Sequence, residues 1–270
     1  MIIIGEKING AIPVVKKAIE ERDAEFIRER AVKQAEAGAD FIDVCASTAP
    51  DKEVETLRWL IEIVQGVVDT PVCIDSPNPM FIKEVLPIIN KPGMINSVNL
   101  EKVEGSDKDK CDVIFPLMKD NEWQVIALTC DSVNGTPRDV PTRVEISKKI
   151  IEKAAGYGIT PDRIHIDPLV MALSTDNNSL LNFVKAMKEV KAIYPTVKFT
   201  SGLSNISFGM PSRKIINQNF MTLAIYEGMD SAIMDPLNKE IMGAIYATEA
   251  LLGRDRHTRK YNTAVRKGRI

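Results

Sequence analysis

Long apolar runs, histidines and paired cysteines are scarce in this sequence. No run approaches the ~18 apolar residues that cross a bilayer, and the stretch Met1–Lys7 becomes charged too early for a signal peptide, so we expect a cytoplasmic protein without a membrane partner. The 270 residues include 2 His and 4 Cys, with no C-x-x-C pair. No familiar zinc or iron-sulfur spacing can be written with them, and neither a bound metal nor a disulfide framework is expected.

Excess charge of one sign is also lacking, because 35 Lys and Arg stand against 37 Asp and Glu. No nucleic-acid partner is expected at this balance. The basic residues do gather at one place, residues 254–270, which hold seven Lys or Arg and one Asp. We interpret this basic tail as a solvated terminal segment or a subunit contact rather than a site for an anionic partner. Apolar residues at 44% and charged residues at 27% are typical of a globular protein, and residues 1–270 are expected to form a single domain.

What the sequence does contain is a regular alternation of short β-branched runs and longer segments of helical periodicity. The expected strands are Ile2–Ile8, Phe41–Ala46, Val72–Ser76, Met94–Val98, Trp123–Thr129, Ile164–Leu169, Lys198–Leu203 and Ala232–Asp235. The expected helices are Ala24–Ala37, Lys52–Val68, Pro79–Ile89, Lys108–Asp120, Thr142–Tyr157, Asn178–Tyr194, Ile215–Glu227 and Lys239–Leu252. Thr142 followed by Glu145 is typical of a capping box. This order and size predict an α/β protein, a single (β/α)8 TIM barrel, with a doubly wound sheet as the main alternative.

Polar side chains stand at the end of every expected strand. They are Glu6, Asn9, Asp43, Asp75, Asn96, Ser97, Asn99, Asp131, Asp167, Ser204, Asn205 and Asp235. Any one of them could simply cap the following helix. In a TIM barrel, however, the carboxyl ends of the strands converge on the active site, and capping does not account for so many carboxylates and amides together.

The composition of this ring narrows the ligand. A Schiff-base aldolase needs a buried lysine at the active end of a strand, whereas Lys198 lies near the start of its strand. Phosphate-binding barrels usually have Gly-rich turns after the last strands, whereas Gly202 lies inside its strand end. A flat heterocycle edged with N–H donors and a carbonyl suits carboxylates and Asn better, and a pterin presents such an edge.

Five strand-end motifs in register support this interpretation. They are Glu6-x-Ile8-Asn9, Cys73-Ile74-Asp75-Ser76, Met94-Ile95-Asn96-Ser97, Ile166-Asp167-Pro168-Leu169 and Gly202-Leu203-Ser204-Asn205-x-Ser207. With them, the chain from Ile3 to about Leu252 resembles the pterin-binding methyltransferases, which exchange a methyl group between tetrahydrofolate and a corrinoid protein. It looks closest to the tetrahydrofolate methyltransferase components of methylamine-type or glycine betaine demethylation systems.

The resemblance implies a role for each matching residue. Asp75, Asn96 and Asp167 would hydrogen-bond the pterin edge, and Arg213 would lie over or beside the ring. Asn205 would reach N5, the atom that carries the methyl group, and would act as the catalytic polar group. The supporting residues that shape the cup and orient these groups would be Glu6, Asn9, Asp43 and Ser97.

The resemblance also implies the partners. The family is usually dimeric, so a homodimer is expected. Folate would be a substrate rather than a tightly bound cofactor. The D-x-H-x-x-G signature of cobalamin-binding modules is absent from the sequence, so cobalamin would be carried by a separate corrinoid protein. That protein would dock over the barrel mouth, where residues 131–141 form either part of the rim or an ordinary surface loop.

The direction of transfer and two other functions stay open. The likeness to the demethylation components predicts formation of 5-methyltetrahydrofolate, but the same site could run from methyltetrahydrofolate to a corrinoid/iron-sulfur protein. A non-catalytic folate-binding barrel would keep the cup without needing Asn205. A dihydropteroate synthase would need an Arg-x-His at the end of the last strand, which here is Met234-Asp235-Pro236.

Overall fold

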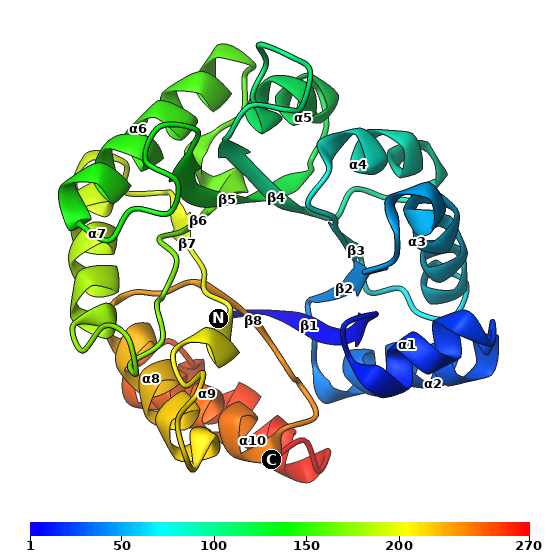
Figure 1. Cartoon of the computed structure of the whole chain (residues 1–270). Helices are drawn as coiled ribbons and strands as arrows, with labels where there is room; N and C mark the ends of the chain where they lie inside the picture. Colours follow the sequence, from blue (N-terminus) through cyan, green and yellow to red (C-terminus); the bar gives the residue numbers. More distant parts are fainter.

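The computed structural model describes residues 1–270 as one ring of parallel strands surrounded by helices (Figure 1). The strands are β1 (Ile2–Asn9), β2 (Phe41–Cys45), β3 (Val72–Asp75), β4 (Met94–Leu100), β5 (Gln124–Asp131), β6 (Ile164–Asp167), β7 (Lys198–Phe199) and β8 (Ser231–Met234). The helices are α1 (Pro13–Glu20), α2 (Ala24–Ala37), α3 (Pro50–Gln65), α4 (Pro79–Val85), α5 (Lys110–Met118), α6 (Val140–Gly156), α7 (Ser179–Ile193), α8 (Arg213–Glu227), α9 (Lys239–Leu251) and α10 (Arg259–Arg266). None of these helices is long and apolar enough to cross a membrane.

The order of the strands confirms the predicted (β/α)8 barrel. They pair in the sequence β7-β6-β5-β4-β3-β2-β1-β8, so β1 lies between β2 and β8. The ring closes beyond the short β7, where Gly202 bridges Ile233 and the Ile233 N–H donates to the Ser201 carbonyl at 3.0 Å. A doubly wound sheet would leave two open edges, and that alternative is wrong.

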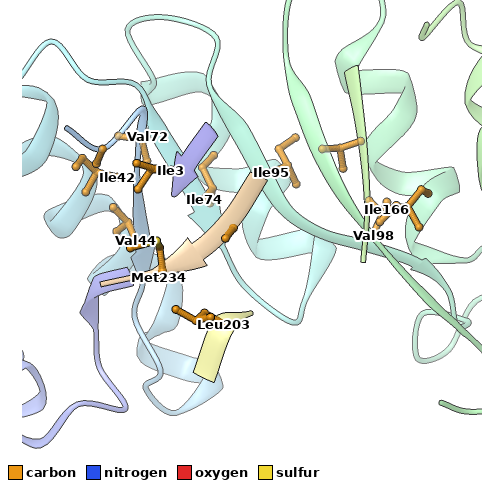
Figure 2. Close-up of a cluster of buried hydrophobic side chains, with 14 of the residues drawn as sticks. Ile3, Ile42, Val44, Val72, Ile74, Ile95, Val98, Ile166, Leu203 and Met234 are labelled. Atoms are coloured by element: carbon orange, nitrogen blue, oxygen red, sulfur yellow. The ribbon is translucent and has the colours of Figure 1, made fainter. Parts of the chain in front are cut away.

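The alternation of side chains along the strands builds the core in two parts. Outward positions such as Ile42, Ile74 and Ile95 belong to the large buried cluster that faces the helices (Figure 2). Inward positions form a smaller apolar cluster with 0–7% exposure, made of Ile4, Phe41, Cys73, Met94 and Ile126. Two residues further along four of these strands, the same inward face carries Glu6, Asp43, Asp75 and Asn96. The strand period therefore places the polar cup directly above an apolar plug.

A hydrogen-bonded cluster adjoins the plug on the β5 to β8 side of the barrel, where His165 pairs in register with Ile126. His165 is within 2.7 Å of the Ser231 hydroxyl and 2.8 Å of Gln124 Oε1, and Lys198 Nζ donates to the same Oε1 at 3.2 Å. Burial and the nearby Lys198 lower the pKa of His165 to about 3, so this ring is neutral. Lys198 is thus tied into the far end of the barrel from the strand termini that carry the cup.

Several boundaries differ from those expected from the sequence. The capping box at Thr142 is wrong: α6 begins two residues earlier, and Asp139 caps it by accepting from the Thr142 N–H at 2.8 Å. The strand expected over Lys198–Leu203 ends at Phe199, because Leu203–Asn205 form a 3-10 turn. Helix α1 has no counterpart among the predicted elements.

The basic tail is not a solvated segment, which corrects the first of its two interpretations. Residues 259–266 form α10, whose Ala264 is 1% exposed and whose start is capped by both carboxylate oxygens of Asp255. Ile270 packs against the core. The basic side chains of this helix are exposed, and those of Arg259 and Lys260 border a hollow that α10 forms with α2 and α9. The tail therefore covers the barrel while its charges stay in water.

Ala264→Glu is expected to lower the free energy of unfolding by about 2–3 kcal/mol, because a carboxylate would be forced into a fully buried position. Val265→Glu is the matched control, since Val265 is 50% exposed on the same helix, and it should change stability by less than about 0.5 kcal/mol. Urea unfolding of both variants measures the difference. Equal stability of the two would mean that α10 is detached in solution.

Candidate active site

The polar ring at the carboxyl ends of the strands separates into two groups. In the first group, the side-chain oxygen accepts a hydrogen bond from the backbone N–H of the residue two positions later. This local turn is available to any Asp or Asn at the end of a strand. These residues are Asn9, Asn78, Asn99, Asp131, Asp167 and Asp235. Glu6, Asp43, Asp75 and Asn96 form the second group: they make no such turn, and the strand period directs them into the barrel.

Asp43 and Asn96 meet inside the cup. The Asn96 Nδ2 donates to Asp43 Oδ1 at 3.3 Å, and Asp43 is 1% exposed. Burial and the nearby carboxylate of Asp75 raise the pKa of Asp43 well above its ordinary value. The contact uses Nδ2 and leaves the side-chain oxygen Oδ1 of Asn96 as an acceptor beside a carboxyl group. Ser97, which follows Asn96 at an irregularity of the β4–β5 register, is half-buried.

Two further carboxylates border the cup with raised pKa values. Burial is the main cause for both: it raises the pKa of Asp75 to about 6, against a hydrogen bond from Cys45, and that of Asp167 to about 6. Asp167 Oδ1 accepts from the Leu169 N–H at 2.8 Å. These two groups change charge just below neutral pH.

Glu6 lies on the β8 side of the cup. Burial and the neighbouring Asp235 raise its pKa to about 7, while Lys7 and Arg213 act in the opposite direction. Asp235 is itself paired with Lys7 Nζ at 3.2 Å. This ion pair across β1 and β8 is a feature that sequence reasoning missed. Lys7 thus brings a basic group to the rim of the ring, although the polar strand-end residues named from the sequence include no basic residue.

Two thiols stand next to the cup carboxylates. Cys45 hydrogen-bonds Asp75 and contacts the Ser47 hydroxyl at 3.2 Å, while Cys73 hydrogen-bonds Asp43 from the layer beneath. Burial and these carboxylates raise the pKa of both thiols above the usual range. The sequence predicts no role for either thiol, because no spacing marks an unpaired cysteine as a neighbour of a carboxylate.

Asn205 lies on the turn that follows β7. Its backbone N–H donates to the Gly202 carbonyl at 3.2 Å, and its side chain is exposed toward the mouth. Leu203, 2% exposed, anchors the same turn in the core (Figure 2). A Cβ at position 202 would stand 3.1 Å from Asn205 Nδ2, so the glycine allows the amide to lie close against its own backbone.

Arg213, at the start of α8, braces this turn. Its guanidinium donates to the Ser204 carbonyl at 2.7 Å and to the Ser207 hydroxyl at 3.0 Å. Asn9 makes a similar connection on the other side of the mouth, because its Oδ1 accepts from the Ser47 hydroxyl at 3.2 Å. The structure therefore brings Asp43, Asp75 and Asn96 into one cup, while Arg213 and Asn9 fasten the loops around it.

One more charged group lies behind the cup and was not singled out from the sequence. Arg143 is 0% exposed, and its Nε donates to the Pro137 carbonyl at 3.0 Å. Its positive charge opposes the upward shift in the pKa of Asp167. A buried arginine on a helix carries no sequence signal that separates it from an exposed one.

A second hollow of about 490 Å³ lies among α2, α9 and α10, at the end of the barrel where the strands begin. Its two acidic residues are already engaged: Asp40 accepts from the Ile3 N–H at 2.8 Å, and Glu249 pairs with the amino terminus. It lacks the convergent unpaired acceptors of the cup, so the cup is the better candidate for a catalytic site.

A TIM barrel whose strand ends surround a cup of buried carboxylates and amides has the architecture of an enzyme that acts on small molecules. The profile of the pterin binding enzyme family matches residues 14–235. The chain therefore belongs to the pterin-binding enzyme family. That match covers every strand that contributes to the cup except β1, which precedes it.

Relatives with full-length and partial similarity support the assignment. A methylcorrinoid:tetrahydrofolate methyltransferase from Eubacterium limosum is 56% identical over 272 residues, which cover 100% of this chain and 98% of the relative. A methionine synthase from Mycobacterium leprae is 28% identical over 87% of this chain but only 20% of its own length. Among solved structures, dihydropteroate synthase from Xanthomonas albilineans in complex with 7,8-dihydropteroate superposes with a TM-score of 0.67 at 18% identity, over 93% of this chain and 92% of that one. This last similarity concerns the fold alone.

Proposed function

We propose that this protein is a methyltransferase that moves a methyl group between a corrinoid protein and N5 of tetrahydrofolate, forming 5-methyltetrahydrofolate. The observation that carries the proposal is the 56% identity to a methylcorrinoid:tetrahydrofolate methyltransferase along the entire chain. The cup agrees with it chemically. Its buried carboxylates and amide suit the donor and acceptor edge of a pterin, and Asn205 is exposed on the turn that follows β7 at the same end of the barrel.

The site residues take the following roles in this proposal. Asp75, Asn96 and Asp167 bind the pterin edge. Asp43 orients Asn96, and Glu6 borders the pterin ring on the β8 side. Arg213 and Asn9 keep the loops of the mouth in place, and Ser97 supports the position of Asn96. Arg213 stays within reach of the ring because its anchor points, Ser204 and Ser207, flank Asn205.

The transfer is an in-line displacement. The lone pair of N5 attacks the methyl carbon, the cobalt–carbon bond breaks with both electrons remaining on cobalt as Co(I), and N5 loses its proton. The proton that N5 releases passes to water or to a nearby carboxylate. In the reverse direction Co(I) attacks the methyl carbon, N5 leaves with the electron pair, and a proton from the same source neutralises it. An amide can donate to N5 in one state and accept from N5–H in the other, which is the role proposed for Asn205.

Cobalamin is proposed to arrive on a separate corrinoid protein. The chain has no D-x-H-x-x-G segment, and Asn205 is exposed after β7, where a docked partner would cover it. Folate is treated as the second substrate. We also propose that the protein forms a homodimer and acts in the cytoplasm. Both proposals are supported by resemblance to the methyltransferase family.

Mixing the purified protein with free methylcob(III)alamin and tetrahydrofolate, in the absence of oxygen, tests the proposed function. The expected result is the spectrum of Co(I), which requires both the protein and tetrahydrofolate, together with 5-methyltetrahydrofolate as the product. Absence of transfer by a protein that binds tetrahydrofolate in a separate titration would favour the non-catalytic folate-binding barrel instead.

The raised pKa values predict how folate affinity depends on pH. A protonated carboxyl no longer accepts two N–H bonds, so pterin binding favours the ionised forms of Asp75 and Asp167 and releases protons where these groups are protonated beforehand. Because the pKa of each is about 6 in the free protein, the Kd for tetrahydrofolate should rise by about tenfold or more between about pH 7.5 and about pH 5.

Isothermal titration in two buffers with different ionisation enthalpies measures both the Kd and the protons released. Asp75→Asn is the informative control, since it should flatten the pH dependence by removing one titrating group. A Kd that stays constant across this range in the unmodified protein would contradict the placement of the two carboxylates at the pterin edge.

A further inference from the structure

The turn after β7 exposes a large aromatic side chain to solvent. Phe208 is 70% exposed, although its neighbours Ile206 and Ser207 are 1% and 0% exposed. Leaving a phenylalanine in water forgoes the free energy that its burial would contribute. Lone exposed apolar side chains are common on protein surfaces, and what sets Phe208 apart is its position beside Asn205.

The backbone around Phe208 is fixed by hydrogen bonds rather than loose. Its N–H donates to the Asn205 carbonyl at 3.1 Å, and its own carbonyl accepts from the Ser174 hydroxyl at 3.1 Å. The Leu173 N–H donates to the Ile206 carbonyl at 3.0 Å, and Arg213 braces Ser204 and Ser207 from the other side. The aromatic ring is therefore presented from a rigid frame that it shares with Asn205.

The backbone hydrogen bond from the Phe208 N–H to the Asn205 carbonyl holds Phe208 next to the proposed catalytic residue. In an in-line displacement the cobalt must lie beyond the methyl group on N5, so the large macrocycle around it has to pass over the turn that carries Asn205. Other exposed apolar side chains stand on loops of the same end of the barrel, Val133 at 90% after β5 and Leu237 at 39% after β8. Phe208 is the one joined directly to the proposed catalytic residue.

We propose that the exposed side chain of Phe208, at the mouth of the barrel, makes an apolar contact with the corrin macrocycle. This inference rests on the proposed function. A corrin has a broad conjugated surface edged with methyl groups and amide-bearing arms. An exposed phenyl ring offers it a large contact area with little loss of side-chain freedom. The contact orients the methyl–cobalt bond toward N5 without touching the pterin.

The test compares kcat/KM for free methylcob(III)alamin at saturating tetrahydrofolate, without oxygen, in the unmodified protein and in Phe208→Ala. The expected result is a fall of about tenfold, equivalent to ~1.4 kcal/mol. The Kd for tetrahydrofolate, titrated in the absence of corrinoid, should change by less than about twofold. Phe208→Trp should retain most of the activity because it keeps an aromatic surface.

Leu251→Ala is the matched control. Leu251 is 86% exposed at the last turn of α9, at the end of the barrel opposite to the mouth, and its removal should leave every parameter unchanged. A kcat/KM in Phe208→Ala equal to that of the control would overturn the inference alone. A matching loss of tetrahydrofolate affinity would also overturn it, by assigning Phe208 to the folate. No transfer by the unmodified protein would overturn the proposed function, and this inference with it.

Discussion

Asn205→Ala is expected to lower kcat for methyl transfer by about a hundredfold, because removing one donor at a centre of developing charge typically costs about 10²–10³ in rate. The Kd for tetrahydrofolate should change by less than about threefold, since the pterin edge is bound by other residues. The rate follows from the appearance of Co(I) during turnover, and the affinity from a titration without corrinoid. The split between the two parameters is the signature of a group whose bond strengthens toward the transition state.

A second asparagine provides the comparison. Asn219 is exposed on α8, where its side chain donates to the Ile215 carbonyl at 2.8 Å, and Asn219→Ala should leave both parameters unchanged. If Asn205→Ala instead loses folate affinity and rate in equal proportion, Asn205 only binds the pterin. If neither parameter changes, the turn after β7 does not reach N5.

Asp75→Asn is expected to raise the Kd for tetrahydrofolate by about 10- to 100-fold, since hydrogen bonds to charged groups contribute about 1.5–3 kcal/mol each. The substitution keeps the size of the side chain but replaces one acceptor oxygen by a donor, which would oppose the N–H groups of the pterin edge. At saturating folate, kcat should stay within about threefold of the unmodified protein. Fluorescence or calorimetric titration gives the Kd.

Asp69→Asn makes the same chemical change before β3 instead of at its end, on an exposed side chain, and should have no effect. An unchanged Kd in Asp75→Asn would remove Asp75 from the pterin edge. Circular dichroism of both variants separates loss of binding from loss of folding.

The barrel was predictable from the sequence because its strands are short, apolar and separated by amphipathic helices of similar length. The prediction failed where tertiary contacts decide the structure. Helix α10 forms in a segment whose charge indicated solvation, because Ala264 and Ile270 find apolar surface between α2 and α9. The strand after Lys198 stops early because residues 203–205 turn to present Asn205.

The candidate site was predictable to the level of which residues face inward, since the strand period alone places Asp43 and Asp75 above the apolar plug. The sequence does not distinguish them from Asp131 or Asp235, whose oxygens are used in local turns. Arg213 was expected from resemblance beside the ring, and the structure adds that its guanidinium fastens the turn of Asn205. Such distinctions depend on side-chain directions that a strand assignment does not contain.

The raised pKa values of Cys45 and Cys73 bear on unwanted methylation of the protein's own thiols. A methyl group on cobalt is an electrophile, and a thiolate is a stronger nucleophile than a neutral amine. Cys45 lies at the cup beside Asp75, where an ionised sulfur could intercept the methyl group and become a dead-end thioether. Burial and the adjacent carboxylates raise the pKa of both thiols, which favours the uncharged thiol and so disfavours methylation of the protein in place of its substrate.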